Sequence, residues 1–287
     1  MPRDAYVNGR FIPHRDGAVH IEDRGYQFAD GVYEVIPIVN GVLVDDIGHL
    51  DRLDRSLAEL QIAAPMSRRA LQMVINELIE RNGVSYGSVY FQVTRGVAPR
   101  DHKFPEAAKP ALVITTKKTK PHSDAVLTKG VSVITIADQR WARCDIKSVS
   151  LLPNILGKQR AAEEGAYEAL QVDQEGYVTE GTSSNAWIVT KDDKVVTRKA
   201  TNAILNGITR SRLIELITAE GLTLEERAFT VAEAKEAREA FVTSSSSLVM
   251  PVTEIDHQPV GNGHPGLLTG RLRATFLEYV DGLRAPQ

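Results

Sequence analysis

The first third of the chain alternates between stretches typical of strands and stretches typical of helices. Residues 5–12 and 31–44 cluster valine and isoleucine, and Asn40-Gly41 in the second stretch favours a hairpin turn. Residues 48–62 place leucines at helical spacing. Residues 67–83 predict a second amphipathic helix, with Ser67 as N-cap and Gly83 just past its end. The four spaced leucines of the first predicted helix are Leu50, Leu53, Leu57 and Leu60.

The rest of the chain continues in the same mixed manner. A polar, proline-containing stretch, residues 118–124, is the candidate linker. It predicts a small N-terminal α/β domain over 1–118, a linker over 119–123 and a larger C-terminal domain over 124–287. Strands and helices mixed in both halves predict an α+β (mixed α/β) fold in two domains. Further strands are expected at 87–96, 110–117, 131–136, 167–173, 176–181, 185–190 and 240–245, and helices at 153–166, 208–221, 231–240 and 270–284.

Composition narrows the class of protein. With 287 residues, 43% hydrophobic and 25% charged, the chain has ample material for a core. Its formal charge of −3 gives no electrostatic case for binding nucleic acid or an anionic membrane. No apolar run approaches the roughly 18 residues of a membrane span, and the first residues lack the apolar core of a signal peptide. The single cysteine, Cys144, fits a reducing compartment, so we expect a cytoplasmic protein.

Common catalytic motifs are missing. There is no Walker-type loop, no G-x-G-x-x-G after a strand, no H-E-x-x-H, no paired C-x-x-C and no G-x-S-x-G. These absences disfavour a Walker-type nucleotide enzyme, a typical dinucleotide dehydrogenase and a structural zinc protein. The seven histidines are scattered without ligand spacing, and no metal site is expected.

Two lysines in residues 143–165 differ in their surroundings. Lys158 lies among helix formers and charges, which is typical of a solvated helix face. Lys147 is followed by ten residues without a charge. Desolvation favours the uncharged amine, which is the nucleophilic form of a lysine side chain. Lys147 is therefore the candidate nucleophile, although most lysines are simply solvated surface residues.

Three turns rich in glycine and hydroxyl side chains complete a chemical pattern. They are VTEGTSSN (178–185), LNGITR (205–210) and VTSSSS (242–247). Such turns are more often simple caps, but LNGITR at a helix start offers the backbone N–H groups and the arginine that suit a phosphate. A lysine that forms a Schiff base, a carboxylate and a phosphate-binding turn together are what pyridoxal 5′-phosphate requires.

These motifs carry a resemblance. DIKSVSLLPNILGKQRA (145–161), VTEGTSSN, LNGITR and VTSS occur in the order seen in fold type IV pyridoxal-phosphate enzymes, also called class IV aminotransferases. EDRGYQFADGVYE (22–34) and HLDRL (49–53) extend the match over nearly the whole chain. The resemblance implies a homodimer with pyridoxal 5′-phosphate at the interface of the two domains.

The resemblance also implies roles for individual residues. Lys147 would be the Schiff-base lysine and Glu180 the partner of the pyridine nitrogen. Arg52 would bind the phosphate, although unaided the sequence favours Arg52 as a surface partner of Asp51 or Asp54. Glu180 taken alone would simply cap a turn. The remaining cofactor contacts that the resemblance implies are Ser183, Ser184, Asn185, Ile208, Thr209 and Ser244, with Ser245 or Ser246.

The loop at residues 93–105 bears on the substrate. A substrate α-carboxylate favours a bidentate donor with a second donor beside it. Arg100 and His102, with Tyr33, resemble the carboxylate trap of D-amino-acid transaminases; a solvated basic loop is the simpler alternative. We therefore expect ping-pong transamination between D-amino acids such as D-alanine or D-glutamate and 2-oxo acids such as pyruvate or 2-oxoglutarate.

Alternatives within the same family stay open. A branched-chain L-amino-acid aminotransferase, an (R)-amine transaminase and an aminodeoxychorismate lyase share most of these motifs. A catalytically silent member that binds the cofactor or a partner without turnover is a different class of function. A shift of the cofactor to its amine form on addition of D-alanine would separate an active enzyme from the silent member.

Overall fold

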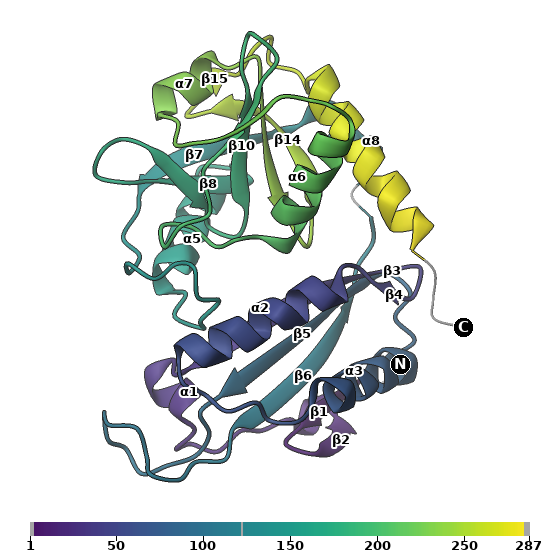
Figure 1. Cartoon of the computed structure of the whole chain (residues 1–287), viewed down its shortest axis with the longest axis vertical. Coiled ribbons are helices and arrows are strands. Elements are labelled where there is room, and N and C mark those ends of the chain that lie inside the picture. Colours follow the sequence, from purple (N-terminus) through teal and green to yellow (C-terminus); the bar gives the residue numbers. More distant parts are fainter. Residues whose placement is uncertain (1–2, 122, 284–287) are drawn as a thin grey trace. The chain divides into compact units, whose positions relative to one another are not determined.

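The computed structural model describes residues 3–121 and 123–283 and divides into two compact units (Figure 1). Among the described residues, the first unit comprises 3–121, 146–150 and 283, and the second comprises 123–145 and 151–282. The segment around Lys147 thus groups with the N-terminal unit. Of the predicted linker 119–123, His122 lies outside the described residues, and the predicted domain boundaries stay a prediction.

The first unit is built on a six-stranded sheet with strand order β2-β1-β6-β5-β3-β4. Helices α2 and α3 pack on one face of this sheet (Figure 1). The described elements of this unit are β1 (Asp4–Val7), β2 (Arg10–Pro13), the 3-10 turn η1 (His14–Asp16), α1 (Arg24–Phe28), β3 (Gly31–Val39), β4 (Val42–Leu43), α2 (Asp46–Glu59), α3 (Arg68–Asn82), β5 (Gly87–Thr94) and β6 (Ala111–Lys118).

The predicted spacing of leucines in α2 is confirmed. Leu50, Leu53 and Leu57 are buried against the sheet, whereas Leu60 follows the last helical residue and is half-buried. In α3 the Ser67 hydroxyl accepts the Ala70 N–H at 3.3 Å, and Gly83 ends the helix with a φ of 56°. Both ends of that helix were predicted from sequence, because a hydroxyl cap and a left-handed glycine satisfy N–H and C=O groups that the helix leaves open.

The turn at Asn40-Gly41 is also confirmed. Val39 pairs with Val42, and Asn40 and Gly41 have φ values of 52° and 78°. Two successive residues at positive φ match the twist of a tight hairpin and explain the Asn-Gly sequence. Asn8-Gly9 makes a second such turn between β1 and β2, so residues 5–12 form a hairpin.

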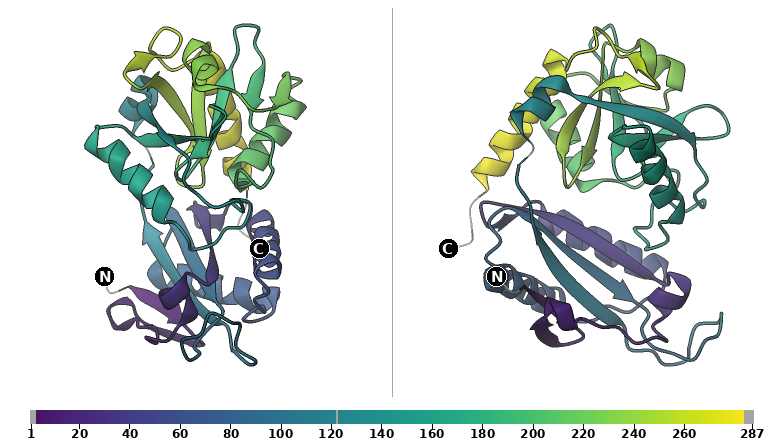
Figure 2. Two further views of the ribbon diagram at one scale, coloured as in Figure 1. Left: turned by 90° about the vertical axis from the view of Figure 1, so that its left-hand side faces the viewer. Right: turned by 180° about the vertical axis from the view of Figure 1, so that it is seen from behind.

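The second unit contains a nine-stranded sheet of order β12-β11-β10-β13-β14-β7-β8-β9, with β15 paired to β14. Helix α5 packs against β7 and β8, α6 packs against β13, and α8 packs against β13 and β14. In Figure 2 the yellow helix α8 lies alongside the strands of this unit. The described elements are α4 (Asp124–Lys129), β7 (Val131–Ala137), α5 (Leu152–Glu163), β8 (Glu168–Val172), β9 (Val178–Gly181), β10 (Asn185–Val189), β11 (Val195–Thr197), α6 (Ile208–Ala219), β12 (Leu224–Glu226), α7 (Val231–Glu236), β13 (Glu239–Ser244), β14 (Leu248–Ile255), β15 (Gln258–Pro259) and α8 (Leu267–Gly282).

One predicted helix was too long. The helix expected at 231–240 ends at Glu236, and strand β13 begins at Glu239. Ala240 pairs with Ile188 on one side and with Val252 on the other, inside the sheet. The pairing of a central strand outweighs the helix propensity of alanine and glutamate, which is a weak preference in comparison.

Replacement of Leu78 by alanine tests the core of the first unit. Leu78 is fully buried in α3, so Leu78→Ala is expected to lower the free energy of unfolding by about 2 to 5 kcal/mol. Met73 on the same helix is 65% exposed, and Met73→Ala is the matched control with little expected effect. Denaturant unfolding followed by circular dichroism measures both; equal losses would contradict the assigned core.

Candidate functional site

Lys147 lies on a short extended segment beside the start of β3. The Tyr33 N–H donates to the Lys147 carbonyl at 3.0 Å, and Val149 N–H donates to the Gly31 carbonyl at 3.0 Å. The Lys147 Nζ lies 4.3 Å from the centroid of the Tyr33 ring. Within the described residues this ammonium forms no hydrogen bond and no ion pair, so the half-buried amine keeps its bonding capacity for a ligand.

A buried ion pair lies next to this segment. Glu34 on β3 is fully buried and accepts Arg52 Nε and Nη2 at 2.8 Å each, one on each carboxylate oxygen. His49 Nδ1 lies 2.7 Å from the same carboxylate. Burial opposes the charge of Glu34, but Arg52 and His49 outweigh it and lower the pKa to about 2.

The surroundings of His49 favour its uncharged form, whereas those of Glu34 favour the charged form. Burial lowers the pKa of His49, and the positive charges of Arg52 and Lys147 lower it further, while Glu34 partly offsets the effect. A histidine of this kind is neutral near pH 7. The cluster of Glu34, His49 and Arg52 therefore holds one carboxylate and one guanidinium as its fixed charges.

The structure corrects the alternative reading of Arg52. The side chain is 9% exposed and binds Glu34, so Arg52 is not the surface partner of Asp51 or Asp54. Those two carboxylates accept Arg68, at 2.5 and 2.9 Å. The phosphate role of Arg52 stays a prediction.

The three residues of the predicted carboxylate trap lie in two places. Tyr33 packs against Tyr90, with ring centroids 5.7 Å apart, and against Lys147. Arg100 and His102 both contact Phe28, at 5.0 and 5.5 Å from its ring centroid. Arg100 and His102 are exposed, and neither forms an ion pair or hydrogen bond with another side chain that the structure describes.

In the second unit Glu180 is a buried carboxylate with several donors. Arg140 Nη1 donates to one oxygen, and Asn185 Nδ2 donates to the other at 3.0 Å. The Leu205 N–H adds bonds of 3.2 and 3.1 Å to both oxygens. This set of donors holds the carboxylate in one orientation. Glu180 is therefore more than the cap of a turn.

Arg140 is itself fixed by a second carboxylate. Its Nε and Nη2 bind Asp138 at 2.9 and 2.6 Å, and Nη2 also donates to the Ala203 carbonyl at 3.1 Å. Burial opposes the charge of the guanidinium, but Asp138 and Glu180 together raise the pKa of Arg140. The permanently charged guanidinium of Arg140 thus binds the Glu180 carboxylate.

Asn185 connects Glu180 to the start of α6. Its Nδ2 also donates to the Leu205 carbonyl at 2.9 Å, and a Cβ on Gly207 would lie 2.1 Å from Asn185 Oδ1. Gly207 is the N-cap of α6 and contributes no side chain, so the first N–H groups of the helix, at Ile208 and Thr209, have no side-chain cap. Open N–H groups at a helix N-terminus suit an anion.

The hydroxyls of residues 182–184 converge on a carboxylate of the protein. Glu168 is 1% exposed and accepts Ser183 Oγ at 2.9 Å and Ser184 Oγ at 3.1 Å, together with the Thr182 hydroxyl. Lys158 Nζ lies 3.4 Å from Glu168 and is exposed, as expected of a helix surface. These hydroxyls fix the turn behind Glu180, and their predicted contact with a cofactor stays a prediction.

The serine run at 244–247 forms the turn between β13 and β14. Ser244 Oγ lies 2.7 Å from Ser247 Oγ and 3.1 Å from Ser246 Oγ, and accepts the Ser247 N–H at 3.2 Å. Ser245 is half-buried. The predicted cofactor contacts of Ser244 and Ser245 stay predictions.

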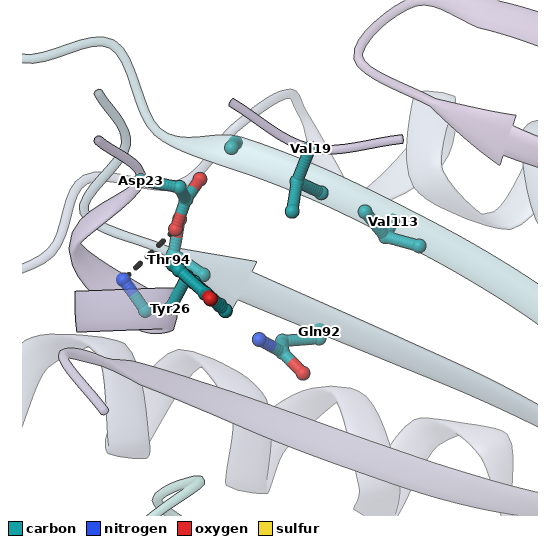
Figure 3. Close-up of a pocket in the computed structure, with 8 residues that line it drawn as sticks. Val19, Asp23, Tyr26, Gln92, Thr94 and Val113 are labelled. Carbon is teal, nitrogen blue, oxygen red and sulfur yellow. Dashed lines mark hydrogen bonds between the residues drawn. The ribbon is translucent and has the colours of Figure 1, made fainter. Parts of the chain in front are cut away.

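A cavity of about 160 Å³ lies in the first unit, apart from the predicted site residues. None of the residues that line it belongs to the predicted site. Figure 3 shows six of its lining residues, which come from the segment around α1 and from strands β5 and β6: Val19, Asp23, Tyr26, Gln92, Thr94 and Val113.

Several partners of the site residues were not predicted from the sequence. Glu34 carried a signal, since it shares the buried face of β3 with Val32, Ile36 and Ile38, and a charge on an apolar face requires a partner. Arg140 carried none, because it lies in an irregular segment after β7. Its partners Glu180 and Ala203 are distant in sequence.

Acid titration tests the Glu34 cluster. A pKa lowered from 4.5 to about 2 contributes stability that is present above pH 4.5 and is lost as the pH falls toward 2. The loss is expected to be about 3 kcal/mol at full protonation. Glu34→Gln should remove this part of the acid dependence while lowering stability at pH 7. Unfolding measured from pH 2 to pH 7 tests this; an unchanged acid slope in the variant would contradict it.

The comparisons with known proteins agree on one family. The model for "Amino-transferase class IV" matches residues 31–255. D-alanine aminotransferase of Bacillus licheniformis is 46% identical over 270 residues, 94% of each chain. That of Staphylococcus haemolyticus is 40% identical over 278 residues, 96% of this chain and 97% of its own.

Solved structures agree on the fold. The branched-chain amino acid aminotransferase of Escherichia coli superimposes with a TM-score of 0.88 at 21% identity, over 96% of this chain and 94% of its own. That of Thermobaculum terrenum, in its PLP-form, superimposes with a TM-score of 0.83 at 24% identity, over 98% and 94%. The mixed α/β architecture expected from the sequence is thereby confirmed as fold type IV. Together with the family model and the relatives, this shows that the chain belongs to the class IV aminotransferases.

Proposed function

We propose that this protein is a pyridoxal-5′-phosphate-dependent D-amino-acid transaminase that exchanges amino groups between D-amino acids of the D-alanine and D-glutamate type and 2-oxo acids. The observation that carries the proposal is the pair of exposed donors Arg100 and His102 in a class IV aminotransferase. The D-alanine aminotransferases, at 39–46% identity over nearly the full chain, support the same substrate class.

The residues present fit the cofactor. Lys147 offers an amine that has no acceptor among the described residues, Glu180 offers an oriented carboxylate, and α6 offers open N–H groups at Ile208 and Thr209. A side chain at Gly207 would collide with Asn185, so this approach to the helix start requires glycine. When bound, the cofactor supplies a ring that accepts the electrons released at the substrate Cα.

Each residue then has a defined task. Lys147 would hold the aldehyde carbon of the cofactor through its amine, and after a substrate amine has displaced it, the freed amine would carry the proton that leaves the substrate Cα. Glu180, held by Arg140 and Asn185, would keep a proton on the pyridine nitrogen. Arg52, and the N–H groups of Ile208 and Thr209, would be the donors for the phosphate.

The α-carboxylate of the substrate binds to Arg100 and His102, with Tyr33 as a further donor. Tyr33 lies apart from the other two within one chain, and the resemblance implies that a loop of the partner subunit reaches into each site, which would bring Arg100 and His102 to Tyr33. Arginine suits this role because its planar fork matches both oxygens of a carboxylate. Where the carboxylate sits fixes the face from which the Cα proton leaves, and hence the chirality of the amino acid used.

The proposal includes a homodimer in the cytoplasm. Support for a dimer comes from the class resemblance and from three exposed apolar side chains at the start of α5, Leu152, Ile155 and Leu156. Support for the cytoplasm comes from the single cysteine, Cys144. Burial raises the pKa of the Cys144 thiol to about 11, which makes it a poor nucleophile. No helix in the described part of the chain is long and apolar enough to cross a membrane.

Exchange of the two lysines tests the catalytic assignment. Lys147→Ala is expected to lower turnover by a factor of about 10³ or more and to abolish the visible absorption of the holoenzyme, because the attached amine is lost. Lys158→Ala removes an exposed amine and should leave turnover within about twofold. Turnover and absorption spectra of both variants test which lysine binds the cofactor. Normal activity in Lys147→Ala would refute the assignment.

Titration of the holoenzyme with three amino donors tests the substrate class. D-alanine is expected to shift the visible band to the amine form of the cofactor and to release pyruvate, while L-leucine and (R)-1-phenylethylamine are not. A response to L-leucine alone would identify a branched-chain enzyme, and a response to the amine alone an (R)-amine transaminase. No response to any donor would favour the silent member of the family or the lyase.

A further inference from the structure

The loop that carries Arg100 and His102 is attached to a buried network centred on Asp30. The Asp30 carboxylate accepts Arg95 Nε at 2.8 Å, Arg95 Nη2 at 3.0 Å and Arg24 Nε at 2.7 Å. The side chains of Arg24 and Arg95 are 4% and 9% exposed. Burial opposes the charge of Asp30, but Arg95 and Arg24 outweigh it and keep the pKa of this carboxyl below its ordinary value.

Arg95 attaches the beginning of the loop to the end of α2. Its guanidinium donates to the Leu60 carbonyl at 2.7 Å and to the Gln61 carbonyl at 2.8 Å. Phe104, at the far side of the loop, stacks on the same guanidinium, with the Arg95 Cζ 3.6 Å from the ring centroid. One buried side chain therefore holds two points of the loop that are nine residues apart.

Arg24 holds the middle of the loop. Its Nη1 donates to the Asp101 carbonyl at 2.5 Å, which belongs to the peptide between Asp101 and His102. The Arg24 Cζ also lies 4.8 Å from the Phe28 ring centroid, and the same ring contacts Arg100 and His102. Arg24 thus fixes both the backbone between the two exposed donors and the ring against which they pack.

Helix α1, which carries Arg24, is tied to the sheet at the start of the loop. The Asp23 carboxylate accepts the Gly25 N–H at 2.8 Å and the Thr94 hydroxyl at 3.0 Å (Figure 3). The Arg24 N–H donates to the Gly96 carbonyl at 2.9 Å. A Cβ on Gly25 would lie 2.2 Å from Thr94 Cγ2, so the helix approaches the strand as closely as glycine allows.

We infer that Arg24 is a positioning residue for substrate binding: with Asp30 it holds Arg100 and His102 where they bind the α-carboxylate. The inference rests on the proposed function. It adds the contacts that hold an exposed loop in the position in which it binds the substrate carboxylate. An arginine and a histidine on an untethered loop lose rotational freedom on binding, which weakens affinity. The bond to the Asp101 carbonyl restricts the loop backbone before the substrate binds, so less freedom is lost on binding.

The test compares the holoenzymes of Arg24→Lys, Arg100→Ala and the variant with both changes. Arg24→Lys keeps a positive charge beside Asp30 but loses the bond geometry to the Asp101 carbonyl. It is expected to raise the KM for D-alanine about tenfold with kcat within about threefold. Arg68→Lys, which changes an exposed arginine bound to Asp51 and Asp54, is the matched control and should leave both constants unchanged.

The double variant separates a positioning role from a general structural role. If Arg24 acts through Arg100 and His102, Arg24→Lys raises the KM less in the Arg100→Ala background, where only His102 remains to be positioned, than it does in the unchanged protein. Multiplied effects in the double variant, or an unchanged KM in Arg24→Lys, would overturn the inference. An unchanged KM in Arg100→Ala would instead refute the carboxylate trap of the proposed function, and the inference with it.

A second variant covers the case in which Arg24→Lys does not fold. Phe104 is 54% exposed, so Phe104→Leu leaves the core intact while removing the ring that stacks on Arg95. It is expected to raise the KM for D-alanine about threefold, and by less in the Arg100→Ala background, where only His102 is left on the loop. The same rise in the Arg100→Ala background would contradict a role through the loop.

Discussion

The bond between Glu34 and Arg52 is the interaction on which the arrangement of the first unit depends. A carboxylate with no exposed surface needs donors on both oxygens, since an unpaired buried charge costs several kcal/mol. Arg52 fills that need from α2, and this fixes α2 against β3 at one register. The same bond orients the guanidinium that we assign to the phosphate.

The second unit uses the same principle with different residues. Glu180, Glu168 and Glu239 are all buried, and each is surrounded by N–H or hydroxyl donors. Glu239 accepts the Leu268 and Thr269 N–H groups at the start of α8, which is a structural cap. The three carboxylates differ in the charged groups that bind them. Of the three, only Glu180 accepts a buried arginine that is itself bound to a second carboxylate.

The elements of the fold were largely predictable because their signals are local. Leucine spacing, the Ser67 cap and the Asn40-Gly41 turn each act within a few residues. The site was predictable only in part. The uncharged run after Lys147 marked this lysine, Glu180 and Arg100 received their roles through the resemblance, and the partners of these residues depend on long-range contacts. Arg24 and Asp101 are 77 residues apart, and no local pattern indicates that they meet. Glu239 shows the reverse failure: it was expected at the end of a helix, but it pairs with Val189 in the sheet.

The extended segment at residues 146–150 has a consequence for how the chain folds during synthesis. The Lys147 carbonyl and the Val149 N–H are the partners of Tyr33 and Gly31 at the start of β3. The first unit is therefore discontinuous, and the described residues 123–145 belong to the second unit. A nascent chain that has reached the end of β6 still lacks these partners, so the start of β3 is paired only after residues 147–149 have been made. The lysine that we propose as the Schiff-base residue is part of the segment that completes this pairing, and a fragment that ends at residue 121 lacks both.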